Sequence, residues 1–595
     1  MAVLGVASNG TDSAGCIVSD GRLVCAAEEE RFSRVKGDGS FPVNAIRWCL
    51  ESTGLGAADI EHIAVSWNYD RYAPTSSAQN AVVGHYRALA ESGIRVDWAR
   101  LGQHVAKYQP TRFHEELRMA FPRLGSRPVM FFNHHDSHAA SSFFFSEFDR
   151  SLILVMDEKG EDACLSLYLG IGNQLRLLKR RKVPHSLGLY YASATEYLGL
   201  RPFRDEGTFM ALASHGEVEP QILQFLTETV LPADALGLPT MSPDLISGRV
   251  FDYERNMGLY TAKMEEALTG LGVDRRAPSA SFTDRHKNFA CAVQRRLEDI
   301  VSGFVATYIR EQQLDALCVA GGVALNCKLN GRLALIDTIG GEPIRFFAPP
   351  WCGDAGGALG AAILNPSTRR TERSVAQFRP SIETVALGPE YSAEEITVAL
   401  RASGVTFRIS DDPAADAVAR LANGEVVGWF QGRAEFGPRA LGQRSIVCDP
   451  RLVSAVGVLN ARIKRRHEFQ PMAPSILLEE AHRYFGSLRA EARFMATAFL
   501  AKRRSVKEIP AAINSADMTV RPQLVEKREG WPYRRLLELW HRRSGVPALL
   551  NTSFNRHEPI VQSPSDAIRT AIASGLDSLV IGRHLVNLHD YTQKI

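Results

Sequence analysis

Short apolar segments that read as β-strands alternate with helical patterns along about the first 365 residues. Such alternation favours an α/β fold, in which strands form a sheet and the intervening helices cover it. Several of these strands end in a polar or glycine-rich turn that opens a helix, and ligands bind at such strand ends. The predicted strands are residues 3–7, 16–18, 23–26, 62–67, 129–132, 152–156 and 316–320.

The 595-residue chain exceeds what one hydrophobic core normally supports, so we expect more than one domain. Residues 1–365 form the first expected domain, and residues 366–390 read as a linker because they open with a polar stretch lacking an apolar period. Residues 391–595 return to strand and helix patterns and form a second expected α/β domain. The formal net charge of +3 argues against an obligate nucleic-acid binder.

The N-terminal residues look like a buried strand and a turn, without the basic and apolar regions of a signal peptide. No run of 18 apolar residues occurs, so we expect no membrane partner. The nine cysteines are scattered and include no C-x-x-C pair, which fits reduced thiols better than disulfides or a zinc site. The sequence therefore predicts a cytoplasmic protein.

Two histidines, His134 and His138, follow the predicted strand at 129–132 and lie four residues apart. On a helix that spacing puts both imidazoles on one face, where they can grip one metal ion. The alternative is a helix start that carries capping and surface histidines.

Asp157 directly follows an apolar strand, and Asp354 stands at a probable helix start. A buried carboxylate needs a partner, although Asp157 can also be a turn residue and Asp354 an N-cap. With the two histidines they would form a site of two nitrogens and two oxygens, suited to Fe(II), Mn(II) or a similar divalent ion. The spacing does not choose the metal.

A second signal is the turn at Gly321 and Gly322, which follows a strand and opens a helix carrying Asn326 and Asn330. Such a turn lets the backbone approach a nucleotide closely, although tight packing explains it equally well. No G-x-x-x-x-G-K-[ST] motif occurs, so an ATP site would not be a P-loop.

The second expected domain concentrates arginine, lysine and small polar residues in turn-rich stretches. Phosphate groups are typically bound by the paired N–H groups of arginine and by hydroxyl or amide donors, so these residues are candidates for a phosphate site. The alternative interpretation is that they are charged residues of the solvated surface. The candidate residues are Arg433, Arg439, Arg444, Lys464, Arg466, Asn551, Thr552, Ser553 and Asn555.

Taken together, these stretches resemble the O-carbamoyltransferases of antibiotic, cephem and nodulation-factor biosynthesis. The resemblance covers nearly the whole chain, and eight short stretches match in the family's order. They are Asp12-Ser-Ala, residues 28–36, His134-His-x-x-His138-Ala, residues 184–188, residues 321–326, residues 353–356, residues 437–442 and residues 551–555.

The resemblance implies an actin/hsp70-like, duplicated ribonuclease-H-like fold, akin to the tRNA threonylcarbamoyl transferase, and a C-terminal domain similar to threonylcarbamoyl-AMP synthase. It implies that carbamoyl phosphate and ATP give carbamoyl-adenylate, whose carbamoyl group passes to a hydroxyl of a small molecule. Metal ligands of the family fall on His134, His138, Asp157 and Asp354, with Fe(II) favoured and a second ion such as Mg(II) left open. Lys36 matches a family lysine near the reacting carbamoyl group.

The sequence departs from the family at Thr11, where many members have a histidine, at Thr208, which replaces a lysine, and at Gln470, which replaces an arginine. A threonine hydroxyl cannot serve as the general base. Either the metal and the phosphate leaving group make a base unnecessary, or Asp12 or His135 serves. The alternatives in function are a threonylcarbamoyl transferase acting on tRNA and a non-catalytic nucleotide-binding regulator. The acceptor cannot be read from the sequence.

Overall fold

The computed structural model describes residues 2–8, 10–73, 77–93, 96–246, 258–368, 385–486, 493–528 and 530–592. The chain divides into two compact units. The first contains Met1–Leu23, Gly39–Val43 and Gly54–Pro380, and the second contains Val24–Asp38, Asn44–Thr53 and Ser381–Ile595. The two short N-terminal segments of the second unit differ from the expected division, and residues 369–384 of the expected linker lie outside the described residues.

Two five-stranded sheets organise the first half of the chain, and their strand orders match. The first sheet has the order β3-β2-β1-β4-β5, and the second has the order β8-β7-β6-β9-β10 when read from its antiparallel edge. In each sheet the central strand, β1 or β6, pairs antiparallel with one neighbour and parallel with the other, and a further parallel strand follows. The strands are β1 (Ala2–Ala7), β2 (Ala14–Ser19), β3 (Arg22–Glu28), β4 (Ile60–Val65), β5 (Val129–Phe131), β6 (Arg150–Met156), β7 (Ala163–Ile171), β8 (Gln174–Lys182), β9 (Ala316–Ala320) and β10 (Arg345–Phe347).

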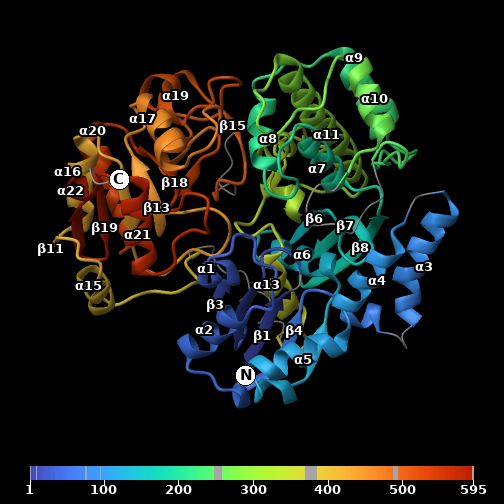
Figure 1. Ribbon diagram of the computed structural model, residues 1–595, viewed down its shortest axis with the longest axis horizontal. Helices are drawn as coiled ribbons and strands as arrows, with labels where there is room; N and C mark the ends of the chain where they lie inside the picture. The colour runs from blue at the N-terminus through green and yellow to red at the C-terminus, as the bar shows by residue number, and fades with distance from the viewer. Residues whose placement is uncertain are drawn as a thin grey trace. The chain divides into compact units, whose positions relative to one another are not determined.

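This repeated order confirms the predicted α/β, duplicated ribonuclease-H-like fold, and the predicted strands fall on β1 to β6 and β9. Helices of this half, labelled in Figure 1 where there is room, include α3 (Ser77–Glu91), α4 (Trp98–Lys107), α5 (Pro110–Ala120), α6 (His134–Phe143), α7 (Leu187–Tyr197), α8 (Glu206–Ala213), α9 (Pro220–Phe225), α10 (Ala262–Gly270), α11 (Asp284–Glu311), α12 (Cys327–Leu333) and α13 (Ala355–Leu364).

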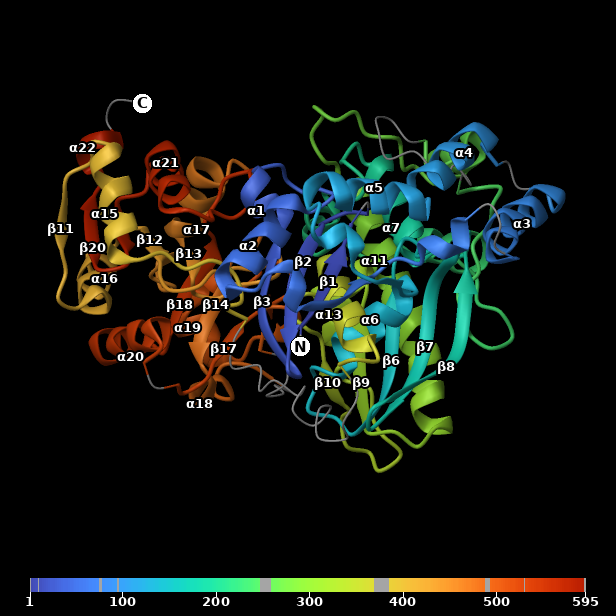
Figure 2. The same cartoon turned by 90° about the horizontal axis from the view of Figure 1, so that it is seen from below.

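Two helices, α6 and α13, lie between the two sheets and pack against each other (Figure 2). Helix α13 covers β1, β2 and β4, whereas α6 covers β6, β7 and β9. Their close approach depends on Gly360, because a Cβ there would meet the carbonyl oxygen of Ser137 at 1.8 Å. Since α6 begins at His134 and Asp354 directly precedes α13, this packing brings the predicted metal ligands together.

The second unit is built on an eight-stranded mixed sheet with the order β11-β20-β19-β12-β13-β18-β14-β17. Its strands are β11 (Phe407–Ile409), β12 (Val427–Phe430), β13 (Arg444–Cys448), β14 (Ala473–Leu477), β17 (Gln523–Val525), β18 (Ala548–Ser553), β19 (Ser578–Ile581) and β20 (His584–Asn587), and β15 (Phe499–Leu500) pairs separately with β16 (Thr519–Val520).

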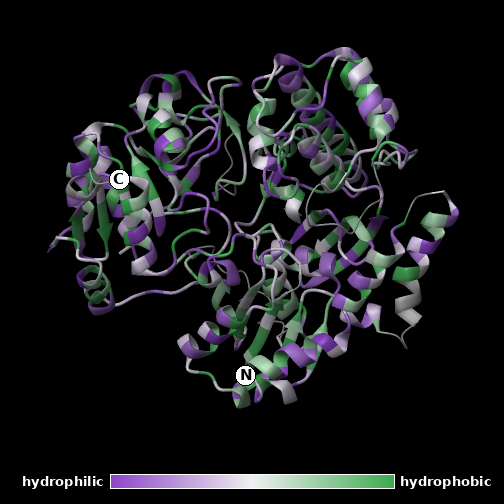
Figure 3. Cartoon of the chain, in the orientation of Figure 1, coloured by the Kyte–Doolittle hydropathy of each residue, from purple (hydrophilic) through white to green (hydrophobic). Residues whose placement is uncertain are grey.

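Helices cover both faces of this sheet. Trp429 packs with α16 and α20 on one face, and its neighbour Phe430 packs with α15 and α21 on the other, as strand alternation requires. The strands are correspondingly apolar, whereas the covering helices contain both hydrophilic and hydrophobic residues (Figure 3). Helices of the unit are α1 (Glu29–Ser33), α2 (Val43–Thr53), α15 (Ala393–Ala402), α16 (Pro413–Ala422), α17 (Ser454–Gly457), α18 (Leu478–Ala481), α19 (Arg503–Glu508), α20 (Pro532–Ser544), α21 (Pro564–Ser574) and α22 (His589–Thr592).

Among the described residues, no helix combines the length and the apolar character needed to cross a membrane.

Candidate metal centre and anion site

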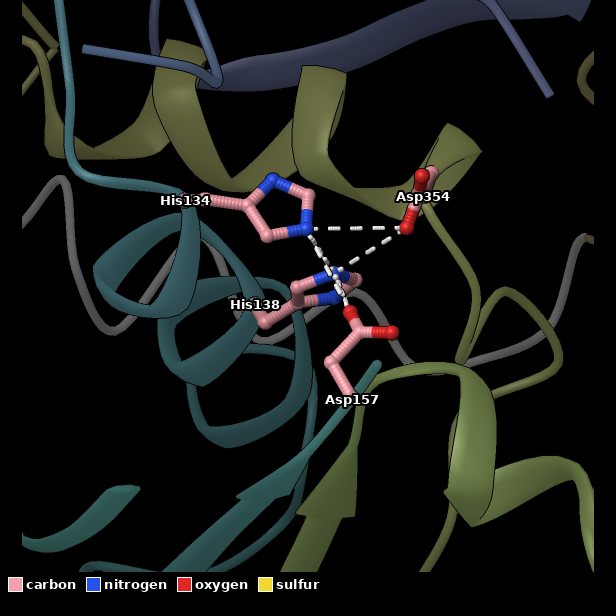
Figure 4. A group of neighbouring side chains, drawn as sticks. All are labelled: His134, His138, Asp157 and Asp354. Carbon is pink, nitrogen blue, oxygen red and sulfur yellow. Dashed lines mark hydrogen bonds and ion pairs between the residues drawn. The ribbon is translucent and has the colours of Figure 1, made fainter. Parts of the chain in front are cut away.

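Four side chains from three parts of the first unit converge on one point (Figure 4). His134 and His138 come from the first two turns of α6, Asp157 directly follows β6, and Asp354 precedes α13. One donor atom from each residue lies within 4.8 Å of the others. The structure therefore brings together the four residues that the sequence predicted as metal ligands.

The donor atoms face one another at distances that suit a shared cation. The Nε2 atoms of His134 and His138 are 3.1 Å apart, and they lie 3.3 and 3.2 Å from Oδ2 of Asp157. Each Nε2 lies 3.6 Å from Oδ1 of Asp354. Two imidazole nitrogens and two carboxylate oxygens fit a divalent transition metal such as Fe(II) or Mn(II).

The surroundings orient these donors inward. Nδ1 of His134 donates a hydrogen bond to the carbonyl oxygen of Ser66 at 3.2 Å, so Nε2 is the ring nitrogen that faces the centre. Oδ1 of Asp157 accepts from the backbone N–H of Glu158 at 2.8 Å, so Oδ2 remains for the centre. Such outer contacts fix the orientation of metal ligands.

The electrostatics of the four groups are mutually stabilising. Burial by itself would lower the pKa of His134, but its bonds to the two aspartates raise that pKa well above its ordinary value. Burial would likewise raise the pKa of Asp157, yet the two imidazoles lower it to about 2. The carboxylates are therefore ionised and ready to bind a cation.

Thr11 contacts a predicted metal ligand directly. Its Oγ1 donates to Oδ2 of Asp354 at 3.0 Å, and its backbone N–H donates to the same oxygen at 3.3 Å. Asp354 therefore presents Oδ1 to the centre while Thr11 holds its other oxygen. Asp12 follows with a positive φ of 53°, and a Cβ at Gly353 would lie 3.9 Å from its Oδ2.

His135, by contrast, is fully buried, and its Nδ1 lies 2.8 Å from the hydroxyl of Ser166. Burial and the charge of His134 hold the pKa of His135 well below its ordinary value. His135 is therefore closed off from an acceptor, which leaves Asp12, or no base at all, among the alternatives raised by the sequence.

We expect Thr11→Ala to change the rate of carbamoyl transfer by less than about 10-fold, because the backbone N–H still holds Asp354. Thr11→His should give no large gain. Steady-state rates of both variants with one acceptor measure this. A rise of two or more orders of magnitude in Thr11→His, the scale of general-base catalysis, would show that the natural protein lacks a base it needs.

The glycine pair at Gly321 and Gly322 has a packing role. Gly321 has a φ of 89°, and a Cβ there would meet the carbonyl oxygen of Met156 at 2.2 Å. Asn326 caps α12 by accepting from the N–H of Leu329, and Asn330 is buried and donates to the carbonyl of Ala324. A nucleotide contact by these residues stays a prediction.

In the second unit, Lys464, Ser553 and Asn555 meet. The Nζ of Lys464 donates to Oγ of Ser553 at 2.9 Å and to Oδ1 of Asn555 at 2.6 Å, and the backbone carbonyl of each of these residues also accepts. All four acceptors are uncharged. Burial lowers the pKa of Lys464 well below its ordinary value, the positive charges of Arg466 and Lys36 lower it further, and the carboxylate of Glu558 acts in the opposite direction.

Other cations gather near this lysine. The Nε of Arg466 donates to Oδ1 of Asn460 at 2.7 Å, and burial together with Arg521 lowers the pKa of Arg466 to about 10. Lys36 forms an ion pair with Glu30 at 3.1 Å, and its charge acts on Lys464. Cations that destabilise one another in this way favour binding of an anion.

Arg444 and Arg433 bind backbone carbonyls of the second unit. The side chain of Arg444 is fully buried, and its guanidinium donates to four backbone carbonyls, those of Gln431, Gly432, Gln443 and Pro389. Arg433 likewise donates to the carbonyls of residues 24, 387 and 388. These contacts brace the turn, and a contact of Arg444 or Arg433 with phosphate stays a prediction.

The remaining candidates for phosphate binding are two residues of β18, whose side chains point to different faces, and Arg439. Asn551 is buried, and its side-chain amide donates hydrogen bonds to Ala440, Ser475 and Gln523 inside the unit. Thr552 points to the opposite face of the strand, away from Ser553. Arg439 is half-buried in the turn before β13. A contact of these residues with phosphate stays a prediction.

The first unit therefore has two ribonuclease-H-like repeats that bring two histidines and two carboxylates together, and the second is an α/β unit in which cationic side chains gather. Comparison of the sequence gives the family. Residues 2–363 match the family model described as "Carbamoyltransferase N-terminus", and residues 418–588 match "Carbamoyltransferase C-terminus". The chain belongs to the carbamoyltransferase family and is a carbamoyltransferase enzyme, so the alternative of a non-catalytic regulator is wrong.

Named relatives agree with this assignment. The chain is 32% identical to nodulation protein NolNO of Sinorhizobium fredii over 97% of this chain and 78% of that protein. It is 35% identical to nodulation protein NolO of Bradyrhizobium diazoefficiens over 76% of this chain and 78% of that protein. It is 29% identical to a 3'-hydroxymethylcephem-O-carbamoyltransferase of Amycolatopsis lactamdurans over 45% of this chain and 48% of that protein. These names confirm the resemblance stated from the motifs.

Proposed function

We propose that the enzyme is an ATP-dependent O-carbamoyltransferase that carries the carbamoyl group of carbamoyl phosphate, through carbamoyl-adenylate, to a hydroxyl of a small natural product. The observation that carries this proposal is the donor set of His134, His138, Asp157 and Asp354, which suits a divalent cation beside polyphosphate. The cation cluster around Lys464 supports use of a phosphorylated donor.

The proposed reaction has three steps. In the second unit, water cleaves carbamoyl phosphate to carbamate and phosphate, with Lys464, Arg466 and Ser553 holding the phosphate. In the first unit, a carbamate oxygen attacks the α-phosphate of ATP, forming carbamoyl-adenylate and releasing pyrophosphate. The acceptor hydroxyl then attacks the carbamoyl carbon, AMP leaves, and the hydroxyl proton passes to a base or to the leaving phosphate.

A divalent cation bound at the centre would neutralise charge on phosphate oxygens as that charge develops. The residues of the chain keep the four donor atoms directed to one point and supply the N–H and O–H groups that hold the outer carboxylate oxygens. Lys36 is proposed to lie near the reacting carbamoyl group, as the family resemblance implies.

The experiment that tests this function needs no knowledge of the acceptor. The purified enzyme should exchange labelled pyrophosphate into ATP only when carbamoyl phosphate is present, because formation of carbamoyl-adenylate is reversible. Full turnover with a suitable acceptor should yield one phosphate, one pyrophosphate and one AMP per carbamate ester. Carbamoyl transfer without ATP, with phosphate as the single by-product, would contradict the adenylate route.

A panel of small hydroxyl compounds and tRNA, followed by mass spectrometry, then separates the two acceptor classes. A hydroxymethyl cephem and oligosaccharides belong in the panel because relatives of the enzyme are named for cephem carbamoylation and for nodulation. A product on tRNA alone would favour the threonylcarbamoyl-transferase alternative.

A further inference from the structure

Glu161, in the hairpin that joins β6 to β7, is a fully buried carboxylate held by uncharged donors. Its Oε1 accepts from the backbone N–H of Asn68 at 2.9 Å and from that of His134 at 3.1 Å. Its Oε2 accepts from the side-chain amide of Asn133 at 2.8 Å. The carboxylate thus ties together the chain beyond β4, the N-cap of α6 and the first residue of α6.

The position of this carboxylate at the start of α6 is favourable in itself. The first N–H groups of a helix have no partner within the helix, and the partial positive charge there attracts an anion. The N-cap residue Asn133 satisfies the N–H of Asp136. Glu161 satisfies the N–H of His134, and so it fixes the end of the helix that carries both histidines.

Glu161 also reaches the group that orients the ring of His134. The carbonyl oxygen of Ser66 accepts from Nδ1 of His134, and Asn68, two residues further along, donates its N–H to Glu161. The backbone of His134 and the segment that carries its ring acceptor are therefore fastened to the same carboxylate. Movement of either would turn Nε2 of His134 away from the other three donors.

We propose that Glu161 is a positioning residue of the metal centre, which holds His134 in the orientation that binds the cation. The inference rests on the proposed metal centre and goes beyond its ligands. It predicts that the removal of Glu161 weakens metal binding more than the accompanying loss of fold stability explains.

The neighbouring residue Asp162 is a matched control. Its side chain is 1% exposed, and it forms ion pairs with Arg71 at 2.9 Å and with Lys182 at 2.6 Å. Both residues are buried carboxylates of one hairpin, so Asp162→Asn disturbs the fold there. The partners of Asp162 lie on η2 (Tyr69–Tyr72) and β8, whereas Glu161 contacts the start of α6.

The test uses Co(II) alone as the probe, with affinity measured by competition with a chelator and geometry by the visible absorption of the bound ion. Glu161→Ala should weaken Co(II) binding by about 10- to 100-fold and alter the absorption, as loss of an outer-shell partner does. Glu161→Gln, which keeps an oxygen for the backbone donors but loses the second carboxylate oxygen, should show a smaller loss of about 3- to 10-fold. Asp162→Asn should lower the melting temperature and leave the affinity unchanged.

Equal affinities in the wild type and Glu161→Ala would overturn the inference and leave the metal centre intact. Should Glu161→Ala fail to fold, an unchanged affinity in Glu161→Gln would overturn it equally. An affinity loss in Asp162→Asn as large as in Glu161→Ala would also overturn it, because general damage to the hairpin would then explain both. Absence of Co(II) binding by the wild type would overturn the metal centre and the inference together.

Discussion

Replacing His138 with alanine should remove the bound metal ion and carbamoyl transfer together, while the protein stays folded. His138 is fully buried and supplies one of four donor atoms, so its loss leaves two carboxylates and a single imidazole. We expect metal affinity to fall by more than about 100-fold, beyond the range for residues that orient a ligand without binding the ion. Elemental analysis of the purified variant and an assay of transfer measure the two losses. Asp354→Ala should behave in the same way.

The matched control is His135→Ala, on the same helix and equally buried, whose ring nitrogen contacts the hydroxyl of Ser166. Circular dichroism should show that all three variants are folded. Full metal occupancy in both His138→Ala and Asp354→Ala would refute the assignment of the site. Loss of metal in His135→Ala of the same size would point to damage of α6 in general.

Replacing Lys464 with methionine should abolish use of carbamoyl phosphate and spare the final transfer step. The amine lies beside Ser553 and Asn555, and its removal takes away the central cation of the proposed phosphate site. We expect the carbamoyl-phosphate-dependent rate to fall by about 100-fold or more, the scale for loss of one buried donor to a reacting anion. Transfer from chemically supplied carbamoyl-adenylate should remain, because we propose that this step takes place in the first unit.

Calorimetry of phosphate binding shows in addition whether the enzyme takes up or releases a proton. Burial lowers the pKa of Lys464, which favours the neutral amine before an anion binds, and a bound anion favours the ammonium form. Binding of inorganic phosphate should therefore take up a proton, seen as a dependence of the binding heat on the buffer. Proton uptake should vanish in Lys464→Met and persist in Lys502→Met, an exposed lysine of the same unit. Equal failure of Lys464→Met with both carbamoyl donors would contradict the division of labour between the units.

The metal ligands could be predicted from the sequence because each lies at the end of a regular element. A histidine pair at helical spacing, an aspartate after an apolar strand and an aspartate before a glycine-rich helix all leave a local pattern. What the sequence could not supply was their mutual approach, which depends on the packing of α6 on α13 at Gly360. The repeated strand order was implied by the family resemblance alone, because the strand pattern predicted an α/β fold without β7, β8 and β10.

The second unit was less predictable, because an arginine in a glycine-rich turn can either bind backbone carbonyls or bind a phosphate. The two roles leave the same pattern in the sequence. Arg444 donates to backbone carbonyls, whereas Lys464 meets Ser553 and Asn555 across 89 and 91 residues of chain. Both side chains are buried, so only their hydrogen-bond partners, which come from distant parts of the chain, distinguish them. Ser66 and Glu161 were not predicted. Ser66 acts through its backbone carbonyl and Glu161 accepts from backbone N–H groups, and neither kind of contact leaves a pattern of residue types in the sequence.

The inclusion of Val24–Asp38 in the second unit has a consequence for synthesis of the chain. Arg31 donates to the carbonyl of Gly437, 406 residues later, and Arg34 donates to the carbonyl of Ile560, 526 residues later. At ordinary translation rates, these arginines leave the ribosome on the order of 20 to 100 s before their partners exist. A nascent chain must therefore keep this segment soluble and available through most of its synthesis, and the second unit is completed only near the end of translation.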